Sequence, residues 1–324
     1  MLVRRVRLEN FRGVVRGEVE FSPLTILLGP NNAGKTTILE ALLLIHGINR
    51  EVIGGLRVAD ILSESHATLK AGGLFHLLHK YSGTSKLLYH VSTLGDVELT
   101  IERRNRSLVF TYAWEKGYCN ITCVGTSCSS VVIRGAPSEL PKAVLIRPGL
   151  RRRIYEEIYK LWVDFVAKGI TRRVAAWVSS VAGEEYSDIL AEPFLGGVYT
   201  LYAYRARDGF RVRLGDLGDG VELLTAARMA VEFAQPELLL WDDVEAHMNP
   251  RALQLLALWL SDLVDQGVQV VLTTHSLEAA TLIAETAEKA RLVRLTMANG
   301  ELEADYYSVE DIDKLKSLGV DVRA

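Results

Sequence analysis

The stretch that most constrains the fold is a glycine loop between two apolar segments. Residues 29–37 read GPNNAGKTT, which matches the pattern G-x-x-x-x-G-K-[ST]. The apolar run 24–28 (LTILL) predicts a buried strand before the loop, and residues 37–45 (TILEALLLI) predict a helix after it. A glycine loop in this setting directs backbone N–H groups and the positive end of a helix dipole at an anion. The sequence therefore predicts a phosphate-binding loop.

The side chains of this loop predict how a nucleotide is held. Lys35 is expected to reach the β- and γ-phosphates, and the Thr36 hydroxyl is expected to hold Mg²⁺. We therefore predict ATP and Mg²⁺ as cofactors. The predicted nucleotide-binding residues of the loop are Asn31, Asn32, Ala33, Gly34, Lys35, Thr36 and Thr37.

Two later strands end in side chains that suit the same chemistry. The apolar run 238–241 (LLLW) ends in Asp242 and Asp243, and the run 268–274 ends at His275. Carboxylates at a strand end suit a Mg²⁺-nucleotide site, in which the first acid orders the metal shell and the second polarises a water. A histidine at the carboxyl end of a strand can touch a γ-phosphate. We predict Asp242 as a metal residue, and Asp243 and His275 as catalytic residues.

Hydrophobic patterning predicts a β-rich N-terminal part followed by a helical insert. Alternation of apolar and polar residues predicts strands in 2–9, 15–21, 87–91, 97–101 and 108–112, with charged hairpin turns such as 103–106. Helical periodicity covers 149–182 and 221–234, and a hairpin is predicted over 198–204 and 210–213. Residues 47–83 follow neither period clearly.

We predict one α/β domain over residues 1–324. It divides into a β-rich ATP-binding lobe over about 1–135, an inserted helical subdomain over about 149–193, and a third lobe over about 198–324.

Charge and hydropathy exclude some classes of protein. The formal net charge of −3 argues against a surface coated with basic side chains for nucleic acid, although a local basic patch remains compatible with it. No apolar run reaches the roughly 18 residues that span a bilayer, and the N-terminus lacks a secretory apolar region. We expect a soluble cytoplasmic protein that has no membrane partner.

Three cysteines lie close together in the β-rich part, at positions 119, 123 and 128. Three sulfurs do not complete a zinc site without a fourth ligand, and no histidine stands beside them. We expect Cys119, Cys123 and Cys128 to be small residues of the strands, with a local disulfide as the alternative.

The order of these motifs resembles that of the ATP-binding-cassette (ABC) ATPases. The residues within these motifs resemble those of the branch that contains structural-maintenance-of-chromosomes (SMC) heads, RecF and the overcoming-lysogenization-defect ATPases. The resemblance is carried by residues 10–13 (NFRG), 29–37, 214–221 (LGDLGDGV), 242–250 (DDVEAHMNP) and 273–276 (TTHS).

The resemblance implies a P-loop NTPase fold of the ABC type, an ATPase head with an N-terminal β lobe and a short helical subdomain. It implies ATP hydrolysis and a head-to-tail homodimer closed by ATP, coupled to a DNA or protein partner. In such a dimer the glycine-rich signature of one subunit meets the nucleotide of the other. The residues added on this ground are Arg12, Gly218, Asp219 and Gly220 for nucleotide binding and Glu245 as an alternative catalytic base.

Several positions depart from the family pattern. Asp243 stands where glutamate is usual, and Gly218 stands where the signature usually has serine. No glutamine lies between Lys35 and Gln235, so the usual Mg²⁺-sensing glutamine has no candidate, and no heptad run of coiled-coil-arm length is present. A nucleotide-gated binding switch with little turnover is therefore the alternative function.

Two further expectations concern Asp219 and the end of the chain. We expect the Asp219 carboxylate to face away from the phosphates and to cap the helix over 221–234. Only residues 276–324 follow His275, so we expect no additional nuclease domain.

Overall fold

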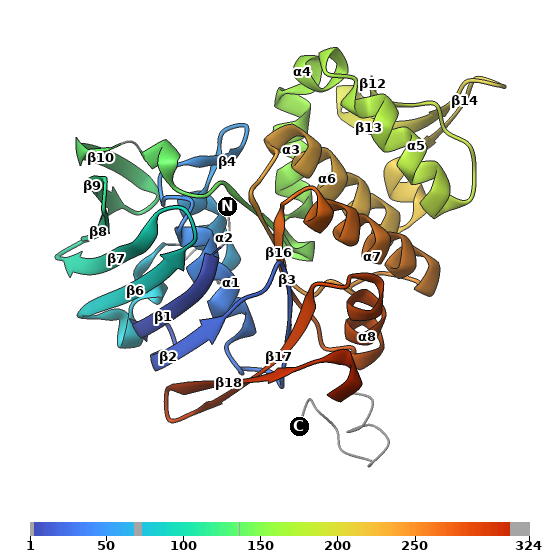
Figure 1. The fold of residues 1–324 in the computed structure, drawn as a ribbon. Helices are drawn as coiled ribbons and strands as arrows, with labels where there is room; N and C mark the ends of the chain where they lie inside the picture. The colour runs from blue at the N-terminus through green and yellow to red at the C-terminus, as the bar shows by residue number, and fades with distance from the viewer. Residues whose placement is uncertain (1–2, 68–72, 136, 312–324) are drawn as a thin grey trace.

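Within residues 3–67, 73–135 and 137–311, which the computed structural model describes, thirteen strands form one mixed sheet (Figure 1). In their order across the sheet they are β10 (Ser127–Arg134), β9 (Gly117–Val124), β8 (Ser107–Trp114), β7 (Gly95–Arg104), β6 (Thr84–Val91), β1 (Val3–Phe11), β2 (Val14–Glu20), β18 (Glu301–Tyr307), β17 (Ala290–Ala298), β3 (Leu24–Leu28), β16 (Gln269–Thr273), β15 (Leu238–Trp241) and β11 (Ala143–Ile146).

The strands β17, β3, β16, β15 and β11 run parallel to one another. All residues of β3, β11, β15 and β16 are buried, which explains why their sequences are mostly apolar rather than alternating. Because the strands are parallel, their carboxyl ends meet at one edge of the sheet. This edge receives the phosphate loop, Asp242 and His275, since each follows one of these strands.

Helices cover this parallel part. The helix α1 (Lys35–Leu44) follows the phosphate loop and packs against β11, β15 and β16, while α7 (Pro250–Asp265) packs on β16 and α8 (Leu277–Thr286) packs on β3 and β17. Nearly every residue of α1 is buried, including its one acid, Glu40. Asn249 caps α7 by accepting a hydrogen bond from Ala252 N–H at 2.8 Å, with Pro250 at the first helical position.

The antiparallel part is a meander of β6 to β10 beside the hairpin β1–β2. Side chains of β8 alternate between buried and half-buried along the strand, as expected when only one face of a sheet meets the core. The strands predicted at 2–9, 15–21 and between 87 and 112 are confirmed by β1, β2 and β6 to β8. The turn predicted at 103–106 joins β7 to β8.

The insert after β11 begins with three helices. They are α3 (Arg151–Lys160), α4 (Trp162–Ala167) and α5 (Ile170–Ala182). A separate three-stranded sheet follows, made of β12 (Asp188–Pro193), β13 (Tyr199–Arg205) and β14 (Phe210–Arg213). The hairpin predicted at 198–204 and 210–213 is confirmed, whereas the expectation of a helical segment up to residue 193 is wrong at β12. The chain then enters α6 (Asp219–Ala234), which packs against α3 and α5.

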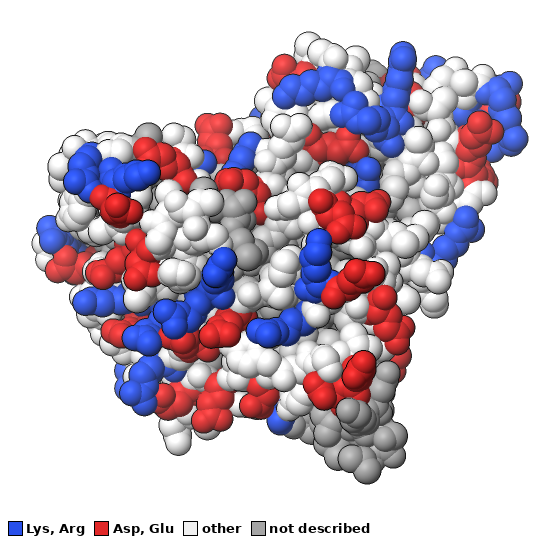
Figure 2. All heavy atoms as spheres, in the orientation of Figure 1, with Lys and Arg blue, Asp and Glu red and all other residues white. Residues whose placement is uncertain are grey.

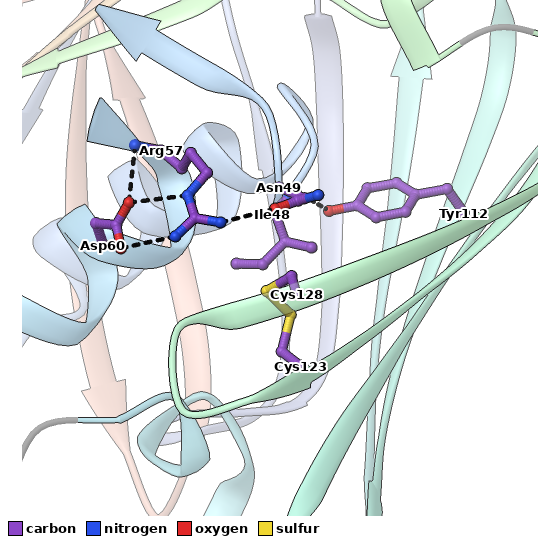
Figure 3. The surroundings of a disulfide bond; sticks show 7 residues. All are labelled: Ile48, Asn49, Arg57, Asp60, Tyr112, Cys123 and Cys128. Carbon is purple, nitrogen blue, oxygen red and sulfur yellow. Dashed lines mark hydrogen bonds and ion pairs between the residues drawn. A yellow bond between two sulfur atoms is a disulfide. The ribbon is translucent and has the colours of Figure 1, made fainter. Parts of the chain in front are cut away.

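Residues 47–67 and 73–83, which have no clear sequence period, hold short elements. They are β4 (Glu51–Ile53), β5 (Leu56–Arg57), α2 (Val58–Ser65), η1 (Phe75–Leu77) and η2 (His79–Tyr81). The Tyr112 hydroxyl on β8 ties the antiparallel part to the end of α1. It accepts a hydrogen bond from Ile48 N–H at 3.0 Å (Figure 3). It also donates one to the Leu44 carbonyl at 3.0 Å.

A disulfide joins Cys123 on β9 to Cys128 on β10 (Figure 3). The two residues are direct cross-strand partners, and their Cα atoms lie 4.1 Å apart. The expectation that all three cysteines are only small strand residues is therefore wrong for this pair, because the turn at Gly125 brings residues 123 and 128 opposite one another. It holds for Cys119, which is buried and outside the disulfide.

Reduction of this disulfide is expected to destabilise the protein by about 2 kcal/mol, the loop-closure entropy of so short a loop. Urea unfolding with and without a thiol reductant measures the change. The double variant Cys123→Ser, Cys128→Ser is the control, and reductant should not alter its unfolding midpoint. Equal midpoints for reduced and oxidised wild type would contradict the expectation.

Candidate nucleotide-binding site

The phosphate loop and two strand ends line one cavity of about 320 Å³ at the carboxyl edge of the parallel strands. Its walls bring together residues from the turn after β1, the phosphate loop, the start of α1 and the segments after β15 and β16. The lining residues are Arg12, Asn31, Asn32, Ala33, Gly34, Lys35, Thr36, Thr37, Asp243 and His275. All of them were predicted as site residues from the sequence.

The backbone of the loop requires glycine at its start. Gly29 has φ of 140°, and a Cβ atom there would lie 2.4 Å from the Leu295 carbonyl oxygen on β17. The Lys35 side chain is only 6% exposed, and its ammonium donates hydrogen bonds to the carbonyls of Gly29 at 2.7 Å and Pro30 at 2.9 Å. Burial lowers the pKa of Lys35, although the carboxylate of Asp243 opposes this shift. A cation is thus held inside the curve of the loop, where phosphate oxygens would bind it.

Oxygen ligands for a magnesium ion meet beside the loop. The Thr36 hydroxyl lies 3.3 Å from Asp242 Oδ2, and Asp242 itself is 4% exposed. Thr273 at the end of β16 donates its hydroxyl hydrogen to Asp242 Oδ1 at 2.8 Å, which fixes the carboxylate. Hydroxyl and carboxylate oxygens are the ligands Mg²⁺ prefers, so Thr36 and Asp242 fit the predicted metal.

Arg147 also belongs to this site, and the sequence interpretation missed it. Its guanidinium Nη2 lies 3.1 Å from Asp242 Oδ2, and its Nη1 lies 3.8 Å from Glu40 Oε1. Arg147 follows β11 directly, as Asp242 follows β15, and the register pairs Ile146 with Trp241. In the sequence Arg147 is a charged residue directly after an apolar run. Its role at the site can be inferred only once β11 and β15 are known to be neighbours.

The two candidate bases differ in where their carboxylates lie. Asp243 lines the cavity, its Oδ1 lies 3.7 Å from His275 Nε2, and its N–H donates to the Thr273 hydroxyl at 2.9 Å. Burial and the adjacent Asp242 raise the pKa of Asp243, and His275 partly offsets them. Glu245 does not line the cavity, and its Oε1 accepts a hydrogen bond from the His275 N–H at 2.7 Å.

The signature residues Gly218, Asp219 and Gly220 lie at the N-terminus of α6, and none of them lines the cavity. The expectation that the Asp219 side chain caps the helix is wrong, since it makes no capping hydrogen bond. It is the first helical residue, and its carboxylate instead accepts a hydrogen bond from Arg151 Nη1 at 2.9 Å. A Cβ atom on Gly220 would lie 2.4 Å from the His247 carbonyl oxygen, so this glycine is needed for packing within the chain.

Comparisons with known proteins agree with this arrangement. The family described as "AAA ATPase domain" matches residues 1–86, which hold the phosphate loop. The family described as "AAA domain, putative AbiEii toxin, Type IV TA system" matches residues 121–280, which hold Asp242, Asp243 and His275.

Solved structures extend the likeness over the whole fold. An Smc head bound to the C-terminal winged-helix domain of ScpA is 14% identical with a TM-score of 0.59, and the match covers 97% of this chain and 100% of that one. The chain has the fold of this Smc head. A second solved structure of similar fold, an Smc head domain with an extended coiled coil bound to the C-terminal domain of ScpA derived from Pyrococcus furiosus, is 12% identical with a TM-score of 0.54, and 98% of each chain is covered. No curated protein matches the sequence.

The surface of the chain carries both signs of charge. On the face in Figure 2, Lys and Arg side chains are interspersed with Asp and Glu, as the near-balanced net charge suggests. In the described ranges no helix combines the length and apolarity needed to cross a membrane.

Proposed function

We propose that the chain binds Mg²⁺-ATP in the cavity of about 320 Å³ and hydrolyses it to ADP and phosphate. The observation that carries this proposal is the convergence of the phosphate loop, Asp243 and His275 on that one cavity. A triphosphate would find backbone N–H groups, the Lys35 ammonium and the N-terminus of α1 on one side. On the other side of the cavity it would meet Asp243 and His275, the side chains suited to activate water.

Asp243 is the proposed base. It takes a proton from the attacking water while the water oxygen bonds to the γ-phosphorus and the β-phosphate oxygen leaves with ADP. Glu245 is less suited to this role because its Oε1 already binds the backbone of His275. Glu245 thereby positions His275, which we propose contacts the γ-phosphate. Thr36 and Asp242 hold the Mg²⁺, and this requires Arg147 to share or release Asp242 Oδ2.

We further propose that ATP closes a head-to-tail homodimer. The signature residues lie outside the cavity of their own chain, while α6 offers a second helix N-terminus with free N–H groups that a nucleotide on another subunit would suit. The Smc heads of similar fold are bound to domains of ScpA, which favours a protein as the further partner. The positive and negative side chains interspersed on the face in Figure 2 offer no separate support for DNA as that partner.

Steady-state hydrolysis by the purified chain, measured together with binding of a fluorescent ATP analogue, tests the proposed activity. Mg²⁺-dependent binding with phosphate release is the expected result. Binding without release, at every protein concentration and with candidate partners, would favour the nucleotide-gated switch. The shorter acid at Asp243 and the missing signature serine motivate that alternative.

The dimer is tested best at Asp219, because any side chain at Gly220 would collide with His247 inside the same chain. Asp219→Trp adds bulk at an exposed position, the first residue of α6, and we expect it to prevent ATP-driven dimerisation while leaving ATP binding intact. Asp219→Ala is the matched control, since it also loses the Arg151 ion pair but adds no bulk. Light scattering with a slowly hydrolysed ATP analogue reads out the dimer. A tryptophan variant that dimerises like the alanine variant would contradict the model.

A further inference from the structure

Three side chains of metal-ligating types meet beside α1, the helix that follows the phosphate loop, and none of them lines the nucleotide cavity. Glu40 lies on α1 one turn after Thr36, and its side chain is fully buried. His66 follows the end of α2, and His76 lies in η1. The ligand atoms of Glu40, His66 and His76 all lie within 4.8 Å of one another.

His76 is held in the form that ligates metals. Its Nδ1 lies 2.9 Å from the Gly73 carbonyl oxygen, which can only accept, so Nδ1 carries the hydrogen. Nε2 of the neutral ring is then an acceptor, and in the described part of the chain this buried atom has no hydrogen-bond partner. A ring nitrogen that donates to a backbone carbonyl while the other nitrogen faces a buried site is the usual arrangement of a metal-bound histidine.

Glu40 and His66 supply the other two ligand atoms. His66 Nε2 lies 2.7 Å from Glu40 Oε1, and the His66 and His76 rings lie 4.2 Å apart. Arg12 Nη1 binds the second oxygen, Glu40 Oε2, at 2.7 Å. Arg12 therefore fixes one carboxylate oxygen, while Oε1 faces the two imidazoles, with Arg147 Nη1 3.8 Å away.

We propose that Glu40 Oε1, His66 Nε2 and His76 Nε2 form a binding site for a divalent transition-metal ion such as Zn²⁺. Two imidazole nitrogens and one carboxylate suit Zn²⁺, Co²⁺, Ni²⁺ or Fe²⁺, whereas Mg²⁺ prefers oxygen ligands only. Metal–ligand distances of about 2.0–2.2 Å require only a small rearrangement of atoms already this close. When the ion binds, His66 takes the other neutral tautomer: Nε2 gives its hydrogen to solvent and Nδ1 takes one from solvent, which leaves the Nε2 lone pair for the ion.

Such an ion joins three segments. It ties the end of α2 and η1 to α1, the helix whose N-terminus faces the phosphates. It also binds the carboxylate that pairs with Arg12, a residue of the nucleotide cavity. The site is distinct from that of the nucleotide Mg²⁺, and its existence does not depend on ATP hydrolysis.

The test is a titration of the full chain, stripped of metal with a chelator, with Zn²⁺ in the presence of excess Mg²⁺ and no nucleotide. A chromophoric zinc indicator reports competition, and Co²⁺ reports the ligand field through its visible absorption. We expect one tight Zn²⁺ per chain and a Co²⁺ spectrum typical of nitrogen and oxygen ligands. His76→Ala should weaken Zn²⁺ binding on the order of a hundredfold or more, because it removes a ligand outright.

The control is His90→Ala, which removes a histidine that also pairs with a carboxylate, Asp96 at 2.9 Å, but on the surface. It should leave the affinity for Zn²⁺ unchanged. His66→Ala is a second variant in case His76→Ala does not fold, which far-ultraviolet circular dichroism will reveal. Absence of a Co²⁺ absorption band in the wild type overturns the proposal, as does Zn²⁺ binding that survives both histidine variants and is displaced by Mg²⁺-ATP.

Discussion

Replacing Lys35 by alanine is expected to lower the affinity for Mg²⁺-ATP on the order of a hundredfold or more and to leave the chain folded. A lysine ammonium that donates two charge-assisted hydrogen bonds contributes about 3 kcal/mol or more, which corresponds to that factor. In the structure these two bonds go to the carbonyls of Gly29 and Pro30. Phosphate oxygens are the better acceptors, so ATP would draw the ammonium onto itself.

Stability should change little in Lys35→Ala. The variant loses two hydrogen bonds but also removes a buried cation whose pKa is lowered by that burial. Fluorescent-nucleotide titration measures the affinity, and thermal unfolding without nucleotide checks the fold. Lys142→Ala is the matched control, because burial also lowers the pKa of Lys142 but that residue precedes β11, at the opposite edge of the parallel strands. An unfolded Lys35→Ala, or one that binds ATP like wild type, would contradict the assignment of the loop.

Asp243→Asn is expected to reduce turnover on the order of a hundredfold or more, while ATP binding stays close to that of wild type. The factor is that of losing a positioned general base. Asparagine suits this position because Asp243 has φ of 52°, a left-handed conformation that asparagine tolerates. The backbone and its hydrogen bond to the Thr273 hydroxyl should therefore be retained. Single-turnover phosphate release from preformed Mg²⁺-ATP complexes separates chemistry from binding.

Glu245→Gln is the comparison that decides between the two acids. Glutamine keeps an oxygen that can accept the His275 N–H, so it should preserve the position of His275 and most of the turnover. If Glu245→Gln shows the large loss while Asp243→Asn turns over normally, Glu245 is the base. The pH profile adds a second readout. Because the pKa of Asp243 is raised, turnover should begin to fall on acidification at a higher pH than for an ordinary aspartate.

Much of the candidate site could be predicted because its residues follow apolar strands. The runs 24–28, 238–241 and 268–274 are local signals, and parallel strands bring whatever follows them to one edge. Arg147 was missed although it follows a fourth such run, since nothing local indicates that β11 is the neighbour of β15. Only that neighbourhood shows that its charge is directed at Asp242 rather than at solvent.

The wrong prediction for Asp219 comes from competition by a partner distant in sequence. Asp219 was expected to cap its own helix, but Arg151, on α3, offers its carboxylate a charged donor. The pair Cys123 and Cys128 was closer to being predictable, because a tight turn between residues five apart places them face to face. The cluster of Glu40, His66 and His76 could not be predicted. His66 and His76 lie in segments whose hydrophobic residues follow neither the helical nor the strand periodicity, so their positions in the fold could not be inferred.

The placement of β3 has a consequence for how the chain folds as it is made. This strand, which carries the phosphate loop, takes both of its hydrogen-bonded neighbours from the far end of the sequence, β16 and β17. A ribosome releases the chain from its N-terminus, so residues 29–268 must emerge before the first of these neighbours exists. The loop cannot be held in its binding shape until then, and ATP cannot assist the early steps of folding. Throughout this interval the run LTILL is an unpaired apolar strand, the kind of segment that chaperones protect in nascent chains.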